Sequence, residues 1–461
     1  MRKLFALLLA LMLMVALLSG CGNAPADGST LNGIALSRFT IVYDENDTGY
    51  ALRAAQYIQA QIQERTGVSL PLAEDDTEPA EYEIVVGNTA REISQKLEAP
   101  QERSNFAILA HGNHVALEGE FFLIAAAAYY FVNTYIPGGE FHSQVPGEPT
   151  VCQPITAEPT SCILLIGDGM GVNHTKLYEV PPLQLSKADG YGDGEEIFYG
   201  YLLGAHGFAR TDSLTGVTDS AAAGTALATG YKTYNGYVGL DQNGQPIENI
   251  VEMANRLGKA TAVMSTEAKT GATPSAFLAH VPDRSDKTAI LKSQEAAVAA
   301  GTVINCNFDT YNATLIQQRV IGSFLKTLSQ VEQDPEGFFL MYEEAYIDKH
   351  SHNNKLTDAF LALSRFNMII GRAMEYACYH PNVFVLITAD HETGDLQLGP
   401  GITTTYRSED HTGQDVPVFA HGLHSQLFDG NTVENVQIPK TIAKFWGAEA
   451  FGDPEGPPAL E

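Results

Sequence analysis

The sequence is short of positive charge. Its 461 residues contain 27 Lys and Arg against 55 Asp and Glu, a formal net charge of −28 at pH 7. A protein that binds nucleic acid over a broad surface needs clustered Lys and Arg to neutralise phosphates. The composition therefore excludes nucleic acid as an expected partner, but it places no limit on a buried cation site.

Cysteine is scarce as well, and no Cys-x-x-Cys pair or zinc-finger spacing is present. Beyond Cys21 the cysteines are Cys152, Cys162, Cys306 and Cys378. Cys152 and Cys162 are the local candidates for a disulfide in an exported protein. Pairing cannot be deduced from spacing alone and stays open.

The first apolar run, residues 4–18, is too short to cross a bilayer, which takes about 20 apolar residues. It follows two basic residues and ends in Leu-Ser-Gly-Cys, so residues 1–21 are typical of a cleaved export signal. This ending resembles the lipobox of bacterial lipoproteins, which implies a lipid on Cys21 that anchors the mature chain to a bacterial membrane. The alternative is a secreted protein cut near Gly20. In either case we expect the mature chain to act outside the cytoplasm.

The rest of the chain predicts two domains of the α/β class. With 44% hydrophobic residues it can bury large cores. The predicted divisions are a tether at 22–30, a small accessory α/β domain at 31–147, a linker at 148–160, a larger domain at 161–450 and a tail at 451–461.

The small domain predicts a β-α-β-α-β-β-α order. Strands are expected at 38–43 and 83–86, a hairpin at 105–117, helices at 49–66 and 121–135, and a short helix through Ile93 and Leu97. This pattern loosely resembles the small α/β domain that precedes the barrel in some exported glycoside hydrolases. It holds no catalytic constellation, and we interpret its histidines, His111, His114 and His142, as surface or core residues.

In the larger domain, three apolar runs each end in possible metal ligands. Residues 162–166, 338–342 and 383–388 are continuous apolar runs, typical of parallel strands buried on both faces. The acids and histidines that follow them are Asp168, then Glu343, Asp348 and His352, then Asp390 and His391. Such sheets bind ligands at the carboxyl ends of their strands. Zn²⁺ takes imidazole and carboxylate ligands whereas Mg²⁺ prefers oxygen, so the mixture indicates more than one metal.

Each of these residues also has an ordinary structural interpretation. Asp168 could cap a helix, Glu343 could pair with a lysine, and His391 could be a hydrogen-bonded core histidine. Together, however, so many polar groups directly after buried strands are costly unless cations hold them.

The stretch VTDSAAAGTALATG at 217–230 has the composition of a helix entrance. Thr218 and Asp219 can cap, the Ala-rich body favours helix, and Gly230 can end it. Ser220 would then stand in the first turn, where unpaired N–H groups and the positive end of the helix dipole favour an anion. Taken alone, such a motif is most often a simple N-cap.

Six segments in the family order resemble the alkaline phosphatase family over residues 161–446. They are IGDGMG at 166–171, TDSAAAGTALATGYKTYNG at 218–236, ATPSAFLAHVPDR at 272–284, EEAYIDKHSH at 343–352, TADHETG at 388–394 and HTG at 411–413. The resemblance implies a central, mostly parallel sheet flanked by helices on both faces.

The resemblance also implies roles for single residues. Ser220 would be the nucleophile that becomes phosphorylated, and Arg284 would hold the phosphate; its alternative is a surface salt bridge with Asp283 or Asp286. The implied metal sites are a first zinc on Asp348, His352 and His411, a second zinc on Asp168, Asp390, His391 and Ser220, and a magnesium on Asp168, Thr273 and Glu343. Lys349 matches a lysine that follows the zinc-binding aspartate in some bacterial members.

Two features depart from the family. Gly271 stands where relatives usually have Asp or His beside the magnesium site, so the surroundings of that ion must differ. The intervals from Arg284 to Glu343 and from His391 to His411 are short, which predicts that an extra domain near the family's dimer interface is missing. The oligomeric state stays open.

The sequence therefore predicts an exported, metal-dependent enzyme that hydrolyses small phosphate monoesters of many kinds through a phosphoserine. One alternative is a phosphodiesterase or sulfatase on the same scaffold. Another is a non-catalytic surface binding protein whose metal site is weakened at Gly271. The physiological substrate cannot be named from the sequence.

Overall fold

The computed structural model describes residues 28–46, 49–97, 102–180, 197–308, 313–399 and 404–461. The predicted export signal at 1–21 lies outside these residues and stays a prediction. Contacts divide the chain into two compact units, Met1–Pro154 and Ile155–Glu461, here called unit 1 and unit 2. Within the described part of the chain, no helix has both the length and the apolar character needed to span a membrane.

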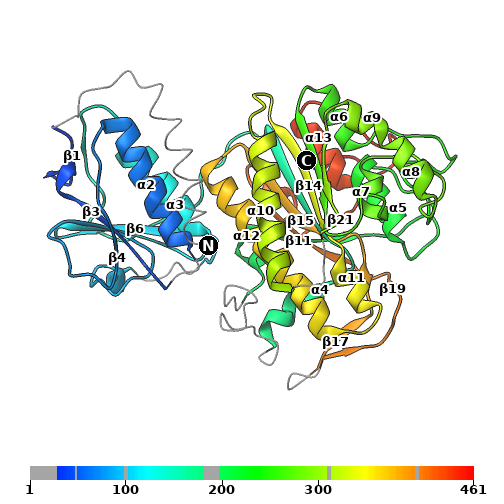
Figure 1. Ribbon diagram of the computed structural model, residues 1–461, viewed down its shortest axis with the longest axis horizontal. Coiled ribbons are helices and arrows are strands. Elements are labelled where there is room, and N and C mark those ends of the chain that lie inside the picture. Colours follow the sequence, from blue (N-terminus) through cyan, green and yellow to red (C-terminus); the bar gives the residue numbers. More distant parts are fainter. Residues whose placement is uncertain (1–27, 47–48, 98–101, 181–196, 309–312, 400–403) are drawn as a thin grey trace. The chain divides into compact units, whose positions relative to one another are not determined.

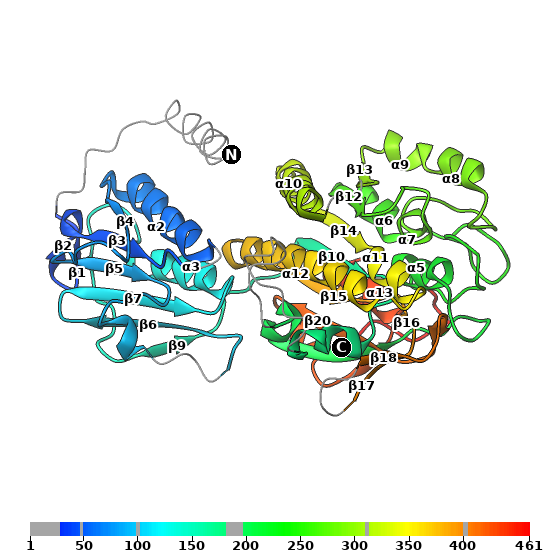
Figure 2. The ribbon, with the colours of Figure 1, turned by 60° about the horizontal axis from the view of Figure 1, so that its bottom comes forward.

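Unit 1 is a six-stranded sheet with two helices. The strand order is β4 (Leu72–Glu74), β3 (Thr40–Tyr43), β5 (Glu83–Val86), β7 (His114–Gly119), β6 (Phe106–His111) and β9 (Thr150–Cys152). The first four strands are parallel to one another, and β6 is antiparallel to both of its neighbours. Helices α2 (Tyr50–Thr66) and α3 (Leu123–Tyr135) lie side by side against the sheet (Figures 1 and 2). A smaller sheet joins β2 (Ile34–Ala35), β1 (Thr30–Leu31) and β8 (His142–Ser143).

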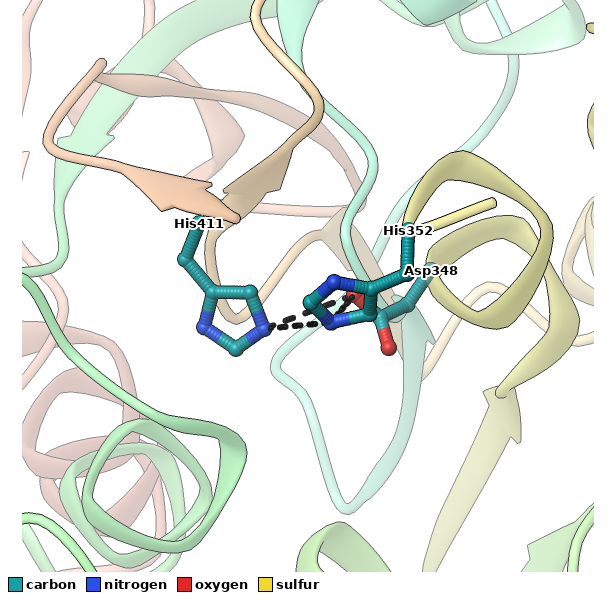
Figure 3. A group of neighbouring side chains, drawn as sticks. All are labelled: Asp348, His352 and His411. Atoms are coloured by element: carbon teal, nitrogen blue, oxygen red, sulfur yellow. Dashed lines mark hydrogen bonds and ion pairs between the residues drawn. The ribbon is translucent and has the colours of Figure 1, made fainter. Parts of the chain in front are cut away.

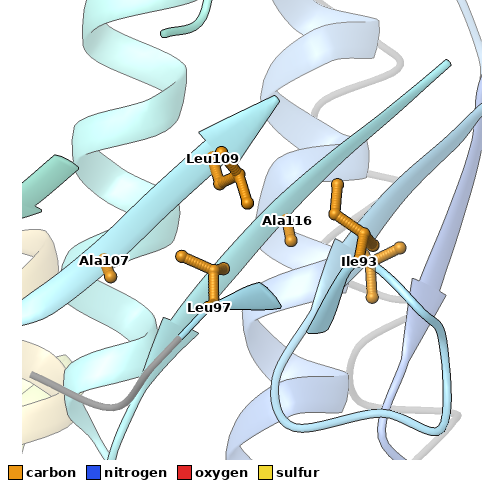
Figure 4. Close-up of a cluster of buried hydrophobic side chains, with 6 residues drawn as sticks. Ile93, Leu97, Ala107, Leu109 and Ala116 are labelled. Atoms are coloured by element: carbon orange, nitrogen blue, oxygen red, sulfur yellow. The ribbon is translucent and has the colours of Figure 1, made fainter. Parts of the chain in front are cut away.

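Most predicted elements of unit 1 are confirmed. Helix α2 ends at Gly67, whose φ of 75° lies in the left-handed region that favours glycine. The predicted short helix is the 3-10 turn η2 (Ser94–Lys96), which covers a cluster of buried apolar side chains on the sheet (Figure 4). That cluster comprises Val85, Ile93, Leu97, Ala107, Leu109 and Ala116.

Three details of unit 1 correct the sequence analysis. The predicted strand at 38–43 starts only at Thr40, since Leu36–Arg38 form the 3-10 turn η1. Strand β4 was not predicted. The predicted linker at 148–160 contains strand β9, because residues 150–152 pair with β6. Three-residue strands carry too little pattern to be recognised without their partners.

Unit 2 is built on an eight-stranded sheet. Its strand order is β13 (Val303–Cys306), β12 (Ala260–Ser265), β14 (Phe338–Glu344), β10 (Ser161–Gly167), β15 (Val383–Thr388), β20 (Val416–His421), β11 (Ala205–Arg210) and β21 (Thr432–Glu434). The first five strands are parallel, whereas β20 is antiparallel to β15 and to β11. The three predicted apolar runs are β14, β10 and β15, adjacent and buried along their whole length.

Helices cover both faces of this sheet. On one face α10 (Ala313–Val331) and α12 (Leu356–Tyr379) contact each other and the parallel strands. The other group is α6 (Ile250–Arg256), which contacts β12 and β14, together with α5 (Ser220–Thr229), α7 (Ala272–Ala276) and α13 (Gln437–Phe445). Figure 1 shows α10 and α12 in front of the sheet and α13 behind it. The predicted mostly parallel sheet with helices on both faces is confirmed.

Small elements complete the edge of the sheet where the strands end. Helix α11 (Tyr346–Ser351) follows β14 directly. Two short hairpins follow β15: β16 (Glu392–Thr393) pairs with β19 (His411–Thr412), and β17 (Leu396–Leu398) pairs with β18 (Thr404–Tyr406). They bring residues that are far apart in the sequence to one place.

Candidate active site

The carboxyl ends of three neighbouring strands meet at one edge of the sheet in unit 2. Ile166 near the end of β10 is in register with Glu343 on β14 and with Thr388 at the end of β15. Asp168 follows the end of β10 directly, and Asp390 follows the end of β15 by two residues. The register therefore places the predicted ligands of all three strands at the same edge, as expected for ligand binding in parallel sheets.

The first cluster consists of Asp348, His352 and His411 (Figure 3). Helix α11 sets Asp348 and His352 one turn apart, and the hairpin of β16 and β19 brings in His411. His352 Nε2 lies 3.1 Å from His411 Nε2, and these two atoms lie 3.3 and 3.5 Å from Asp348 Oδ1. Two imidazole nitrogens and a carboxylate oxygen thus face one point, which is a ligand set suited to Zn²⁺.

The far nitrogens of both histidines are held by backbone carbonyls. His411 Nδ1 lies 2.9 Å from the carbonyl oxygen of Thr218, and His352 Nδ1 contacts that of Glu409. A carbonyl only accepts, so each Nδ1 carries the proton and each Nε2 keeps its lone pair. Thr393 also donates a hydrogen bond of 2.6 Å to Asp348 Oδ1. Such outer contacts orient ligands for a metal.

The second cluster consists of Asp168, Asp390 and His391, all buried. His391 Nε2 lies 3.3 Å from Asp390 Oδ2 and 3.5 Å from Asp168 Oδ1. The ring of His391 stacks on that of His411 with centroids 3.5 Å apart, so the two clusters adjoin. The hydroxyl oxygen of Ser220 lies 3.2 Å from His391 Nε2.

Ser220 is the first residue of helix α5, as predicted. Asp219 is the N-cap, and its Oδ1 accepts a hydrogen bond of 2.9 Å from the backbone N–H of Ala222. Gly230 ends the helix with a φ of 73°. Only 5% of Ser220 is exposed. Its hydroxyl is thus presented beside the second cluster, at the helix end that favours an anion.

The third predicted set consists of buried oxygens that make no hydrogen bond within the described part of the chain. Asp168 Oδ1, Thr273 Oγ1 and Glu343 Oε1 are buried and make no hydrogen bond to the described residues. Glu344, the next residue on β14, gives the contrast, because its two oxygens accept hydrogen bonds of 2.6 and 2.7 Å from the Arg365 guanidinium. Buried oxygens without donors are costly, and an oxygen-preferring cation such as Mg²⁺ fits this set.

Burial dominates the electrostatics of these side chains. It raises the pKa of Asp168 and of Glu343 well above their ordinary values, and neighbouring carboxylates raise them further. Burial also raises the pKa of Asp390 to about 6, with a further contribution from the charge of Asp348. It lowers the pKa of His391 well below its usual value. A bound cation would favour the ionised carboxylates and the neutral imidazole, which are the forms that ligate metals.

Arg284 lies beside the start of α5. Its Nη1 donates to Asp219 Oδ2 at 3.0 Å, and 38% of its side chain is exposed. The alternative partners are engaged elsewhere, since Asp283 accepts from Ser285 and Asp286 caps the helix Lys287–Ser293. Arg284 is therefore anchored on the residue that precedes Ser220, with the rest of its guanidinium open to a ligand.

Sequence reasoning missed one acidic residue at this edge. Glu267 follows the end of β12 by two residues, just as Asp390 follows β15, and its Oε2 pairs with Lys349 Nζ at 2.6 Å. The strand ATAVMS was not recognised among the apolar runs, so the acid after it was not considered. The signal that could have found it is the shared placement of acids two residues after a strand.

Comparison with known proteins agrees with this geometry. The family model described as Alkaline phosphatase matches residues 160–305 and 318–403. The chain belongs to the alkaline phosphatase family. Alkaline phosphatase 3 of Bacillus subtilis (strain 168) is 28% identical over 329 residues, 60% of this chain and 70% of the relative. Alkaline phosphatase 4 of the same strain is 27% identical over 335 residues, covering 61% and 71%.

Solved structures share the fold. The alkaline phosphatase from the Antarctic bacterium TAB5 superposes with a TM-score of 0.53 at 23% identity, over 64% of this chain and 98% of that one. The alkaline phosphatase of Thermus thermophilus gives a TM-score of 0.53 at 16% identity, over 64% and 93%. Family membership makes the protein a phosphatase that acts on phosphate monoesters, in a family that depends on metals.

Proposed function

We propose that this phosphatase hydrolyses monoesters through a covalent phosphoserine on Ser220. The observation that carries the proposal is the contact between the Ser220 hydroxyl and His391 Nε2 at 3.2 Å, at the start of a helix and beside both ligand clusters. A serine in the first turn of an ordinary helix would need no such neighbours.

We assign two zinc ions and one magnesium ion to the three donor sets. The first zinc would be held by Asp348, His352 and His411, the second by Asp168, Asp390, His391 and Ser220, and magnesium by Asp168, Thr273 and Glu343. Bound cations supply charge that lowers the pKa of a nearby hydroxyl and stabilises the attacking and leaving oxygens of an in-line displacement. A solved mutant of the TAB5 phosphatase is described with magnesium bound in one of its metal sites.

The residues of the chain then have separate tasks. The Ser220 oxygen attacks phosphorus, and the bond from phosphorus to the ester oxygen breaks so that the alcohol leaves. Water then attacks the phosphoserine, which releases phosphate and restores the serine hydroxyl. Arg284 donates hydrogen bonds to phosphoryl oxygens, and the N–H groups at the start of α5 favour the same negative charge. Asp219 accepts a hydrogen bond from Arg284 and also caps helix α5, so it aligns the arginine with the start of that helix.

The test combines metal analysis with a trapping experiment. We expect the purified protein to contain zinc, to hydrolyse a chromogenic phosphate monoester faster than a diester or a sulfate ester, and to take up labelled phosphate covalently at low pH. Ser220→Ala should abolish labelling and lower kcat by at least about 10³-fold, in line with the loss of a nucleophile elsewhere. Ser329→Ala on α10 is the matched control.

Wild-type labelling in Ser220→Ala would contradict the nucleophile assignment. A faster rate on the diester or the sulfate ester would instead favour the alternative enzymes on this scaffold.

A further inference from the structure

Position 271 has no side chain, and a neighbouring carboxylate fills the space. A Cβ built on Gly271 would lie 1.6 Å from Glu267 Oε1 and 2.1 Å from Glu267 Cδ. The backbone itself does not require glycine, because Gly271 has φ −60° and ψ 161° as the N-cap of α7. These angles are open to any residue, and Asp is favoured at an N-cap. The carboxylate of Glu267 therefore occupies the space that a side chain at position 271 would need.

Glu267 is tied to the residues around the third donor set. Its Oε2 pairs with Lys349, the neighbour of Asp348, at 2.6 Å. Its backbone N–H donates to Ser265 Oγ at 3.0 Å, and the same hydroxyl donates to Glu343 Oε2. Only 18% of the Glu267 side chain is exposed. The carboxylate of Glu267 thus lies between Gly271 and Lys349. Gly271 is two residues before Thr273, and Lys349 follows Asp348.

We propose that Glu267 supplies, from the end of β12, the outer carboxylate of the magnesium site that a side chain at position 271 would otherwise provide. It is a positioning residue that accepts hydrogen bonds from the hydration shell of the ion and fixes Lys349. The inference rests on the magnesium assignment above. Mg²⁺ keeps several of its waters when it binds protein, so an acceptor just outside the ligands matters for its affinity.

The decisive experiment moves the carboxylate from one position to the other. Zinc-loaded protein is titrated with Mg²⁺ by calorimetry for wild type, Glu267→Ala, Gly271→Asp and the double variant Glu267→Ala/Gly271→Asp. We expect Glu267→Ala to weaken Mg²⁺ binding by roughly 10- to 100-fold, the usual cost of losing an outer-shell partner. Gly271→Asp alone should also weaken it, because its Cβ meets Glu267. The double variant should recover most of the wild-type affinity.

Recovery in the double variant separates an outer carboxylate from a merely structural residue, since a second mutation does not normally repair a damaged fold. Glu295→Ala, an exposed acid on the helix Glu295–Ala299, controls for net charge. Unchanged Mg²⁺ affinity in Glu267→Ala, or a double variant no better than that single variant, would overturn the inference. So would a wild type that takes up zinc but no magnesium, and the phosphoserine on Ser220 would then still stand by its own labelling test.

Discussion

Both units bury a carboxylate after a parallel strand, but they treat it differently. In unit 1, Asp75 follows β4, and its two oxygens accept backbone hydrogen bonds of 3.3 and 3.1 Å from Glu45 and Ala90. In unit 2, Asp390 follows β15; its Oδ1 accepts two backbone hydrogen bonds, whereas its buried Oδ2 accepts none from the described residues. Burial of an acid is therefore no sign of a metal site by itself. What distinguishes Asp390 from Asp75 is a buried oxygen without a hydrogen-bond donor among the described residues, together with the neighbouring ligands Asp168 and His391.

The arginines repeat the contrast. Arg91 in unit 1 is 10% exposed, and it donates to Glu83 Oε2 at 3.1 Å and to the carbonyl of Asp75 at 3.0 Å. The side chain of Arg284 in unit 2 is 38% exposed, and among the described residues its guanidinium has a single hydrogen-bond partner, Asp219. In unit 1, Asp75 and Arg91 are thus both engaged in stabilising the fold. Unit 2 keeps groups of both signs available at one edge of the sheet.

The largest expected effect comes from exchanging the two aspartates for asparagine. Asp390→Asn should lower the zinc content and reduce kcat/KM by more than the roughly 100-fold seen when outer-shell partners are changed, because an anionic ligand is lost. Asp75→Asn should leave zinc content and kcat/KM unchanged and lower stability by about 1–3 kcal/mol, because the amide N–H₂ faces a backbone donor. Elemental analysis, steady-state rates and thermal unfolding measure the pair. Loss of zinc in Asp75→Asn, or full activity in Asp390→Asn, would break the comparison.

Replacing the two arginines by alanine should give a smaller effect, again on activity in unit 2 and on stability in unit 1. Arg284→Ala should lower kcat/KM by about 10- to 100-fold, since hydrogen bonds to a charged group contribute about 1.5–3 kcal/mol. Its melting temperature should stay close to that of wild type, because the side chain is partly exposed and has one partner. Arg91→Ala should instead lower the melting temperature and leave kcat/KM close to that of wild type. Should Arg284→Ala melt early and keep its kcat/KM, the residue would be structural and its proposed contact with phosphate would be wrong.

The sequence predicted the frame of unit 2 but only part of its site. Continuous apolar runs are enough to define β10, β14 and β15, because parallel strands buried on both faces need no alternation. Local composition also defines the helix that starts at Ser220. The ligand sets and the role of Arg284 came from resemblance to a family, since no local pattern says which histidine meets Asp348.

What the sequence could not show depends on distant packing. His411 reaches the first cluster through the two-residue strands β16 and β19, which carry no periodic signal. Thr393, which donates to Asp348, was missed for the same reason. Glu267 was missed because its relation to Gly271 exists only once β12 and α7 have packed. Each of these contacts joins segments whose proximity is a property of the whole sheet.

The last expected effect is on the stability of the metal-free protein: it varies with pH and tests the oxygen of Asp390 that accepts no hydrogen bond from the described residues. In protein treated with chelator, burial and the charge of Asp348 hold the pKa of Asp390 at about 6, above the value of about 3.9 expected in the unfolded chain. The folded state therefore binds this proton more tightly than the unfolded state does. The resulting stability is complete below about pH 4 and is lost as the pH rises through about 6.

Asparagine at position 390 is neutral at every pH and removes this dependence. We therefore expect the free energy of unfolding of chelated wild type, minus that of chelated Asp390→Asn, to fall by up to about 3 kcal/mol between pH 4 and pH 7. Groups distant from position 390 titrate equally in both proteins, so the difference reports Asp390 together with Asp168, whose pKa the charge of Asp390 raises. Adding zinc should reverse the trend for wild type alone, since the cation favours the carboxylate and binds more tightly as the pH rises. If this difference in unfolding free energy stayed flat or rose with pH in the chelated proteins, the Asp390 carboxyl would be solvated or paired in solution. Both of its oxygens would then have partners, as those of Asp75 do in unit 1.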